Sequence, residues 1–125
     1  MKKNSQWKSL QYAWRGLSYV FTHEKNFRIE CFCTVLVLIS IFVLHLGKFE
    51  TLVVLLLCAA VLILEIVNSM VEHFLDILKP RLSYQVQIVK DILAGMVLIS
   101  VIFSIIVGLL IYIPALFEYF AHFVL

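Results

Sequence analysis

The stretch LVVLLLCAAVLILEIVNSMVEHFLD (52–76) places an uninterrupted apolar run directly before a segment with several polar residues. The uninterrupted run is 52–64, and the predicted span continues through the first polar residues from Leu52 to Val71. That length is close to the roughly 20 residues with which a helix crosses a bilayer. We therefore predict a transmembrane helix over 52–71, and the polar residues at its end then lie at a membrane boundary.

Two further apolar runs, 29–46 and 92–117, are also long enough to cross a membrane. The 125 residues are 63% hydrophobic and 14% charged, whereas soluble domains are only about half apolar. We therefore predict an all-α membrane protein with three transmembrane helices in one domain, 1–125. The net charge of +2 gives no electrostatic reason to expect a nucleic-acid partner.

Basic residues are concentrated outside the spans, before the first one and in the connection 72–91. They are Lys2, Lys3, Lys8, Arg15, Lys25 and Arg28, followed by Lys79, Arg81 and Lys90. The connection between the first two spans holds Lys48 alone. Because basic residues favour the cytoplasmic side, we expect the N-terminus and the 72–91 connection there. No early apolar block precedes the basic residues, so we do not expect the first span to be a cleaved signal.

The segment 1–28 has the pattern of an amphipathic helix. Its apolar face consists of Trp7, Leu10, Trp14, Leu17 and Phe21, at steps of three and four, and its polar face of Lys8, Gln11, Arg15, Ser18 and Thr22. Two tryptophans opposite basic residues are typical of a helix that lies in the headgroup region of a membrane. Packing of this helix on the protein's own bundle is the alternative, and the two are compatible.

Prolines and cysteines add local expectations. Pro80 is expected to end the second helix, with a connection of about ten residues to follow, and Pro114 to kink or terminate the third. Cys31, Cys33 and Cys58 lie in the predicted spans without a metal-binding spacing, and we expect free thiols.

Polar residues near the end of the second span form one stripe. Glu65, Asn68, Glu72 and Asp76 fall within an arc of about 80° at about 100° per residue. Ionisable groups close to hydrocarbon are costly and usually face a bundle interior for a functional reason. A structural network between helices is the alternative for Glu65 and Asn68, and a solvated helix end is equally expected for Asp76.

Two more charged groups belong to the same face of the membrane. Glu24 and Arg28 come just before the first span, and Lys90 and Asp91 just before the third. Carboxylates suit Mg²⁺, which usually binds one or two of them together with substrate phosphates, and a lysine can neutralise phosphate charge. The sequence has no P-loop, no Rossmann fingerprint and no protein-kinase signature. These residues predict an acidic, Mg²⁺-binding site at the cytoplasmic interface, without specifying a reaction.

Two motifs carry a family resemblance. ExxNSxxExxxD (65–76), followed by KDxxAGxVL (90–98), resembles the small prokaryotic diacylglycerol kinases, a family that includes undecaprenol kinases. HEKNFRIE (23–30) is similar to the family's entry into its first span, and the resemblance extends from about Trp7 to Pro114. It implies a homotrimer of three-span protomers in the bacterial cytoplasmic (inner) membrane, with active sites shared between subunits. The implied reaction is transfer of the ATP γ-phosphoryl group to the hydroxyl of a membrane lipid.

The resemblance also implies roles for individual residues. Glu65 matches the general base, and Asn68 the asparagine beside it. Glu24 and Glu72 match the carboxylates that hold Mg²⁺ on ATP. The positions matching nucleotide contacts are Lys90, Asp91 and Tyr12.

Some positions depart from the family pattern. The residues after Pro80 are Arg81, Leu82 and Ser83, where the family often has an acidic residue, Tyr and His. Ser5 occupies the position of an N-terminal arginine of enterobacterial members, for which Lys8 is a possible substitute, and Met70 replaces a usually small residue.

The acceptor lipid and two other function classes stay open. NFRI (26–29) and VGLLIYIP (107–114) are more similar to the undecaprenol kinase branch, but diacylglycerol remains a candidate acceptor. An ion- or proton-conducting oligomer that uses the same acidic stripe is one alternative. A non-catalytic assembly protein is another, which the altered residues 81–83 favour.

Overall fold

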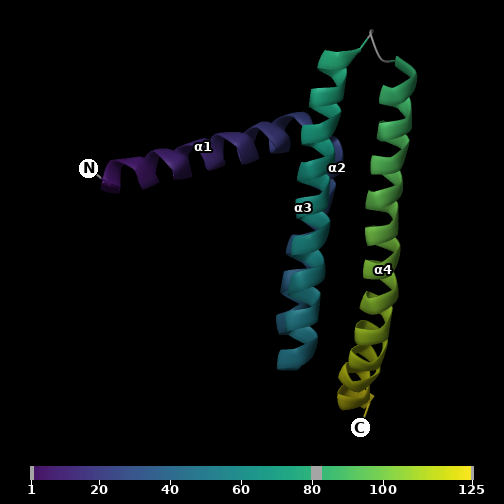
Figure 1. Ribbon diagram of the computed structural model, residues 1–125. Coiled ribbons are helices and arrows are strands. Elements are labelled where there is room, and N and C mark those ends of the chain that lie inside the picture. The colour runs from purple at the N-terminus through teal and green to yellow at the C-terminus, as the bar shows by residue number, and fades with distance from the viewer. Residues whose placement is uncertain (1, 80–82, 125) are drawn as a thin grey trace.

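The computed structural model describes residues 2–79 and 83–124, and within them the chain is entirely helical apart from short connections (Figure 1). The helices are α1 (Lys2–His23), α2 (Lys25–Val43), α3 (Lys48–Leu78) and α4 (Ser83–Val124). The predicted all-α class is confirmed.

The helices form a narrow bundle with one arm. α2, α3 and α4 run alongside one another, while α1 projects sideways from the bundle (Figure 1). Packing contacts join α3 to both α2 and α4, and α1 to α2. The N-terminus therefore lies far to the side of the bundle, and the C-terminus lies at the end opposite the α3–α4 connection.

Among the described residues, α2, α3 and α4 are the helices long and apolar enough to cross a membrane. This confirms the number of predicted spans. α3 has 31 residues and α4 has 42, about 46 and 63 Å at 1.5 Å per residue, against a hydrocarbon core of about 30 Å. Both helices therefore extend beyond the predicted spans 52–71 and 92–117.

The connection after α3 is shorter than the expected ten residues. α3 ends at Leu78 and α4 begins at Ser83, so most of the expected loop continues the two helices. Pro80, which we expected to end the second helix, lies outside the described residues. The apolar run in the sequence marks the part of each helix suited to lipid, whereas the backbone hydrogen bonds continue into the polar flanks.

The expected helix over 1–28 is divided at Glu24. α1 ends at His23, Glu24 has an extended backbone with φ −102° and ψ 111°, and Lys25 begins α2. α2 ends at Val43, before the expected boundary at residue 46. His45 then adopts a positive φ of 50°, which turns the chain toward α3. Glu24 therefore occupies the bend between the arm and the bundle.

Pro114 does not terminate the last helix. α4 continues through it to Val124. A proline removes one backbone hydrogen bond, and transmembrane helices tolerate this where neighbouring groups compensate.

A small core joins α3 and α4 next to their connection. It consists of buried Leu75, Val86 and Leu93, with Val71, Leu78, Val89 and Met96 packed against them. Most other large apolar side chains are exposed. The outer surface of the bundle is therefore suited to contact with lipid or with other protein helices.

We predict that Leu75→Ala lowers the thermal stability of the detergent-solubilised protein. The substitution removes a core side chain outside the predicted span and leaves a cavity, which costs about 2–5 kcal/mol. Circular dichroism melting is the measurement. Ile77→Ala is the matched control, because Ile77 is 79% exposed. Equal melting temperatures for the two variants would contradict the importance of this core.

Candidate active site

The polar stripe of α3 faces the interior of the bundle along its first two turns. Glu65 and Ser69 are each only 2% exposed, while Asn68 and Glu72 are partly buried. Asp76, farther along, is exposed. The stripe therefore divides into a buried part and a solvated end.

Carboxylates from three parts of the chain gather around Glu65. Glu24 at the bend and Glu72 on α3 lie close enough for their charges to act on Glu65. Glu30 on α2 is close enough to interact with it as well. The fold thus brings Glu24 and Glu30 next to the α3 stripe and creates an acidic cluster.

Glu30 is the residue of this cluster that the sequence analysis missed. Its Oε2 atom is buried and has no hydrogen-bond partner within the described residues, and the same holds for Oδ1 of Asn68 and Oγ of Ser69. Buried unpaired polar atoms are costly, so these atoms are suited to bind a ligand. A useful signal in the sequence is that Glu30 is the ionisable residue at the start of the first apolar run.

Arg28 holds the bend rather than pairing with Glu24. Its Nη1 donates hydrogen bonds to the carbonyl oxygens of Phe21, at 2.9 Å, and Thr22, at 2.8 Å. These carbonyls belong to the last turn of α1, where a cation satisfies unpaired acceptors and interacts favourably with the helix dipole. In the part of the chain that the structure describes, Glu24 has no ion pair. Its carboxylate therefore remains available for a ligand.

A second contact attaches the arm directly to α3. His73 Nδ1 lies 2.9 Å from the carbonyl oxygen of Ser69, which can only accept a hydrogen bond. Nδ1 of His73 therefore carries the proton. In the neutral ring, Nε2 accepts from the Tyr19 hydroxyl at 3.0 Å. Tyr19 also stacks on His23, with ring centroids 4.0 Å apart. This contact holds the last turns of α1 against α3.

Lys90 forms an ion pair with Asp76, the residue at the solvated end of the stripe. Its Nζ lies 2.7 Å from Oδ1 of Asp76, so the pair links α4 to α3. Asp91 is exposed and accepts a hydrogen bond from Gln87 at 2.9 Å. Exposed ion pairs contribute little to stability. Lys90 can therefore exchange Asp76 for a more highly charged anion at small cost.

Sequence comparisons identify the family to which this chain belongs. The model of the prokaryotic diacylglycerol kinases matches residues 11–112. The chain belongs to the prokaryotic diacylglycerol kinase family. The match covers every residue of the acidic cluster, together with Lys90 and Asp91.

Two relatives carry names of lipid kinases. A diacylglycerol kinase of Synechocystis is 37% identical over 109 residues, which are 86% of this chain and 62% of the relative. An undecaprenol kinase of Bacillus subtilis is 32% identical over 113 residues, which are 90% of this chain and 92% of the relative. The chain thus spans less than two thirds of the Synechocystis protein. No solved structure matches it significantly.

The donor set of this family member fits a magnesium ion that is shared with phosphates. Within residues 2–79 and 83–124, no group of three or more His, Cys, Asp or Glu side chains is arranged to hold a metal. Mg²⁺ usually takes one or two carboxylates together with substrate phosphates. Glu24 at the bend and Glu72 on α3 provide two carboxylates that both lie near Glu65, and they therefore fit this mode of binding.

Tyr12 is not brought to the acidic cluster of its own chain. It is exposed on α1, where the Arg15 guanidinium lies 5.9 Å from its ring centroid. At 1.5 Å per residue along α1, Tyr12 is roughly 17 Å from the bend at Glu24.

The positions that depart from the family pattern differ in their surroundings, and Met70 lines a pocket together with Glu24 and Ser69. Arg81 and Leu82 lie outside the described residues, while Ser83 begins α4. Ser5, Lys8 and Met70 are exposed. The three cysteines are free, as predicted.

We predict that Arg28→Gln loosens the bend. The variant loses the charge that binds the last carbonyls of α1, and such hydrogen bonds contribute about 1.5–3 kcal/mol. Spin labels at positions 10 and 77, both exposed, should show a broader distance distribution by pulsed electron spin resonance.

Arg15→Gln is the control for this measurement, because Arg15 contacts Tyr12 of its own helix. An unchanged distribution in Arg28→Gln would show that other contacts hold the arm.

Proposed function

We propose that the protein is an ATP- and Mg²⁺-dependent lipid kinase that phosphorylates the hydroxyl of a membrane lipid. The observation that supports this most strongly is the convergence of Glu24, Glu65 and Glu72 in a member of this family. Glu24 comes from the bend and the other two carboxylates from α3, and they meet where the apolar part of α3 ends. A lipid hydroxyl and a water-soluble nucleotide can both reach such a boundary.

In this proposal Glu65 is the general base. It takes the proton of the lipid hydroxyl while the oxygen forms a bond to the γ-phosphorus and the bond from this phosphorus to the ADP oxygen breaks. Proton transfer by a positioned carboxylate typically contributes 10²–10⁴-fold to a rate. Its burial excludes water, and Asn68, one turn away, has an unpaired buried oxygen with which to orient the hydroxyl.

Charge neutralisation is assigned to the surrounding residues. Glu24 and Glu72 would hold Mg²⁺, which when bound neutralises charge on the transferred phosphoryl group. Lys90 leaves Asp76 and binds the nucleotide phosphates, and Asp91 contacts the nucleotide. Phosphoryl transfer depends mainly on positioning and electrostatic stabilisation, so a site made of charged side chains is sufficient.

We further propose a homotrimer with shared active sites. Tyr12 is too far along α1 to reach its own cluster, so it would contact a nucleotide bound by a neighbouring protomer. The exposed apolar side chains of α2, α3 and α4 provide surface for such packing. The arm α1 would lie in the headgroup region of the bacterial cytoplasmic membrane, with the N-terminus and the α3–α4 connection on the cytoplasmic side.

Undecaprenol and diacylglycerol are the candidate acceptors. The relative from Bacillus subtilis, 92% of whose own length is matched, is named an undecaprenol kinase. This match favours undecaprenol, while the higher identity of the Synechocystis relative keeps diacylglycerol as the second candidate.

The purified protein is expected to transfer radiolabelled phosphate from ATP to at least one of these lipids. The assay uses mixed micelles with Mg²⁺, with undecaprenol and diacylglycerol in parallel, and thin-layer chromatography of the products. Omission of Mg²⁺ should abolish the signal. Absence of a labelled product with both lipids would refute the proposed function.

Glu65→Gln is expected to reduce kcat by about 10²–10⁴-fold, because the amide cannot accept the hydroxyl proton. Nucleotide binding, measured by isothermal titration calorimetry, should persist. Glu118→Gln is the matched control, since Glu118 is exposed far from the cluster in α4. Unchanged turnover of Glu65→Gln would remove its assignment as the base.

A further inference from the structure

Ser69 on α3 is a buried serine whose hydroxyl has no partner in the chain. The residue is 2% exposed, and its Oγ atom makes no hydrogen bond within residues 2–79 and 83–124. Serines in helices often donate to the carbonyl oxygen three or four residues earlier. Ser40 and Ser100 do so, to Val37 at 2.6 Å and to Val97 at 2.7 Å. The hydroxyl of Ser69 differs from theirs, and it is available to a ligand.

The carbonyl oxygen of Ser69, in contrast, already has a partner. His73 donates to it from Nδ1 at 2.9 Å, and the Tyr19 hydroxyl donates to Nε2 of the same ring at 3.0 Å. Neither bond involves Oγ of Ser69. The free hydroxyl therefore belongs to a residue whose position is fixed by α1 and α3, which is the arrangement of a preorganised donor.

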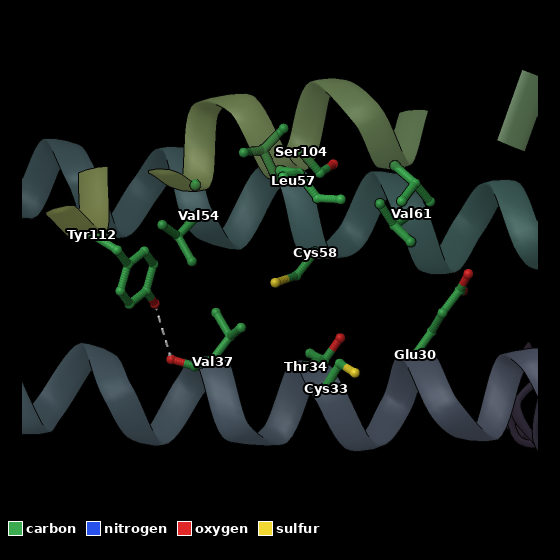
Figure 2. A pocket seen from close by; sticks show the side chains of 13 residues that line it. Glu30, Cys33, Thr34, Val37, Val54, Leu57, Cys58, Val61, Ser104 and Tyr112 are labelled. Atoms are coloured by element: carbon green, nitrogen blue, oxygen red, sulfur yellow. Dashed lines mark hydrogen bonds between the residues drawn. The ribbon is translucent and has the colours of Figure 1, made fainter. Parts of the chain in front are cut away.

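A cavity of about 610 Å³ lies between α1 and α3, and Ser69 lines it together with Glu24. The remaining lining consists of side chains from these two helices. We refer to this space as the arm cavity. Another cavity, of about 350 Å³, lies between α2, α3 and α4 and has Glu30 at one end (Figure 2). Ser69 therefore shares a cavity with the carboxylate at the bend, whereas Glu30 faces a different one.

Ser69 also lies between the two carboxylates of α3 that the proposed reaction uses. It is about 6 Å beyond Glu65 and about 4.5 Å before Glu72 along the helix axis at 1.5 Å per residue. The three positions fall within about 60° of the helix circumference, so they share one face. In the proposed reaction, the phosphoryl group passes from the nucleotide beside Glu72 to the lipid hydroxyl beside Glu65. Ser69 occupies the level between the two.

We propose that the Ser69 hydroxyl donates a hydrogen bond to an oxygen of the γ-phosphate of ATP and keeps this bond while the phosphoryl group is transferred. This inference rests on the proposed kinase function. A phosphate oxygen accepts hydrogen bonds, and the hydroxyl can donate to it without breaking a bond within the chain. Charge on the transferred group is spread over its three equatorial oxygens. Ser69 stabilises one of them and forms no covalent bond.

The nucleotide fits the Ser69 hydroxyl better than the lipid does. Glu24, the proposed ligand of the Mg²⁺ that ATP carries, lines the same cavity. Asn68 already offers the lipid hydroxyl an acceptor, its unpaired Oδ1 atom. A γ-phosphate needs donors instead, and Ser69 supplies one.

Removal of the hydroxyl should not destabilise the protein. A buried hydroxyl without a partner costs free energy, and alanine has a higher helix propensity than serine. Ser69→Ala should therefore melt at the same temperature as the unmodified protein or at a higher one, measured by circular dichroism in detergent. A lower melting temperature would show that the hydroxyl bonds within the protein, and it would overturn the inference.

Nucleotide binding tests the contact without turnover. Isothermal titration calorimetry with Mg²⁺ measures Kd for β,γ-methylene-ATP, which keeps a γ-phosphate but cannot transfer it, and for ADP, which lacks one. In Ser69→Ala, Kd for the ATP analogue should rise at least about tenfold because a hydrogen bond to a charged group is lost, while Kd for ADP should stay within about twofold. Equal changes in both Kd values, or no change in either, would overturn the inference.

Ser100→Ala is the matched control for both measurements. It removes the hydroxyl of another serine in a membrane-spanning helix, but this hydroxyl is bonded within α4. Both Kd values should remain those of the unmodified protein. A selective loss of the ATP analogue in Ser100→Ala as well would overturn the assignment to Ser69.

Turnover distinguishes the phosphate from the lipid as the partner of Ser69. In Ser69→Ala, kcat should fall about 10²–10³-fold, as on loss of one donor to a developing charge. KM for the lipid should stay unchanged. A higher lipid KM with unchanged nucleotide Kd values would place the hydroxyl on the lipid and overturn the inference.

The unmodified protein separates this inference from the proposed function. If it binds neither nucleotide and phosphorylates neither lipid, both proposals fail. If it phosphorylates a lipid while Ser69→Ala retains its kcat and both Kd values, the inference about Ser69 alone fails.

Discussion

Hydrocarbon provides no hydrogen-bond partner, so a carboxylate in a membrane-spanning helix must face other polar groups or water. This constraint organises the bundle around Glu65. The residue is 2% exposed, and the charges of Glu24, Glu30 and Glu72 act on it. Because like charges repel one another, this buried group of carboxylates is a place where a cation would be stabilised. The middle of the bundle can remain apolar because the charged groups outside the acidic cluster lie toward the helix ends, for example Lys48 and Glu50 at the start of α3 and Glu118 near the end of α4. The acidic cluster and the lipid-suited surface are therefore two results of the same constraint.

The arm contributes to the site through its attachment rather than through its own packing. α1 has few contacts with the bundle, yet Arg28 caps its last turn and Tyr19 bonds to His73 on α3. Both contacts lie within one or two turns of Glu24. They hold the bend at which this carboxylate lies near Glu65. A carboxylate on an unrestrained junction would be a poor ligand, because ordering it at the moment of binding costs entropy.

Several features of the site could be predicted from residue spacing, and others could not. The buried stripe follows from helical periodicity, because positions four residues apart share a face. Glu30 was missed because its importance depends on which face of α2 meets α3. The partner of Arg28 could not be predicted either, because the bend at Glu24 brings the carbonyl oxygens at the end of α1 to its guanidinium. Lys90 likewise pairs with Asp76 because the short connection brings the ends of α3 and α4 together.

The sequence by itself determined the helical class, the number of membrane-spanning helices and the polar face of α3. These features depend on composition and local periodicity alone. Bilayer thickness sets the length of an apolar span, and the helical repeat sets which residues share a face. The tertiary structure decided where each helix ends, which carboxylates meet and where space is left between helices. Such properties arise from contacts between residues far apart in the chain, such as Tyr112 with Ser40 and Glu30 with Glu65.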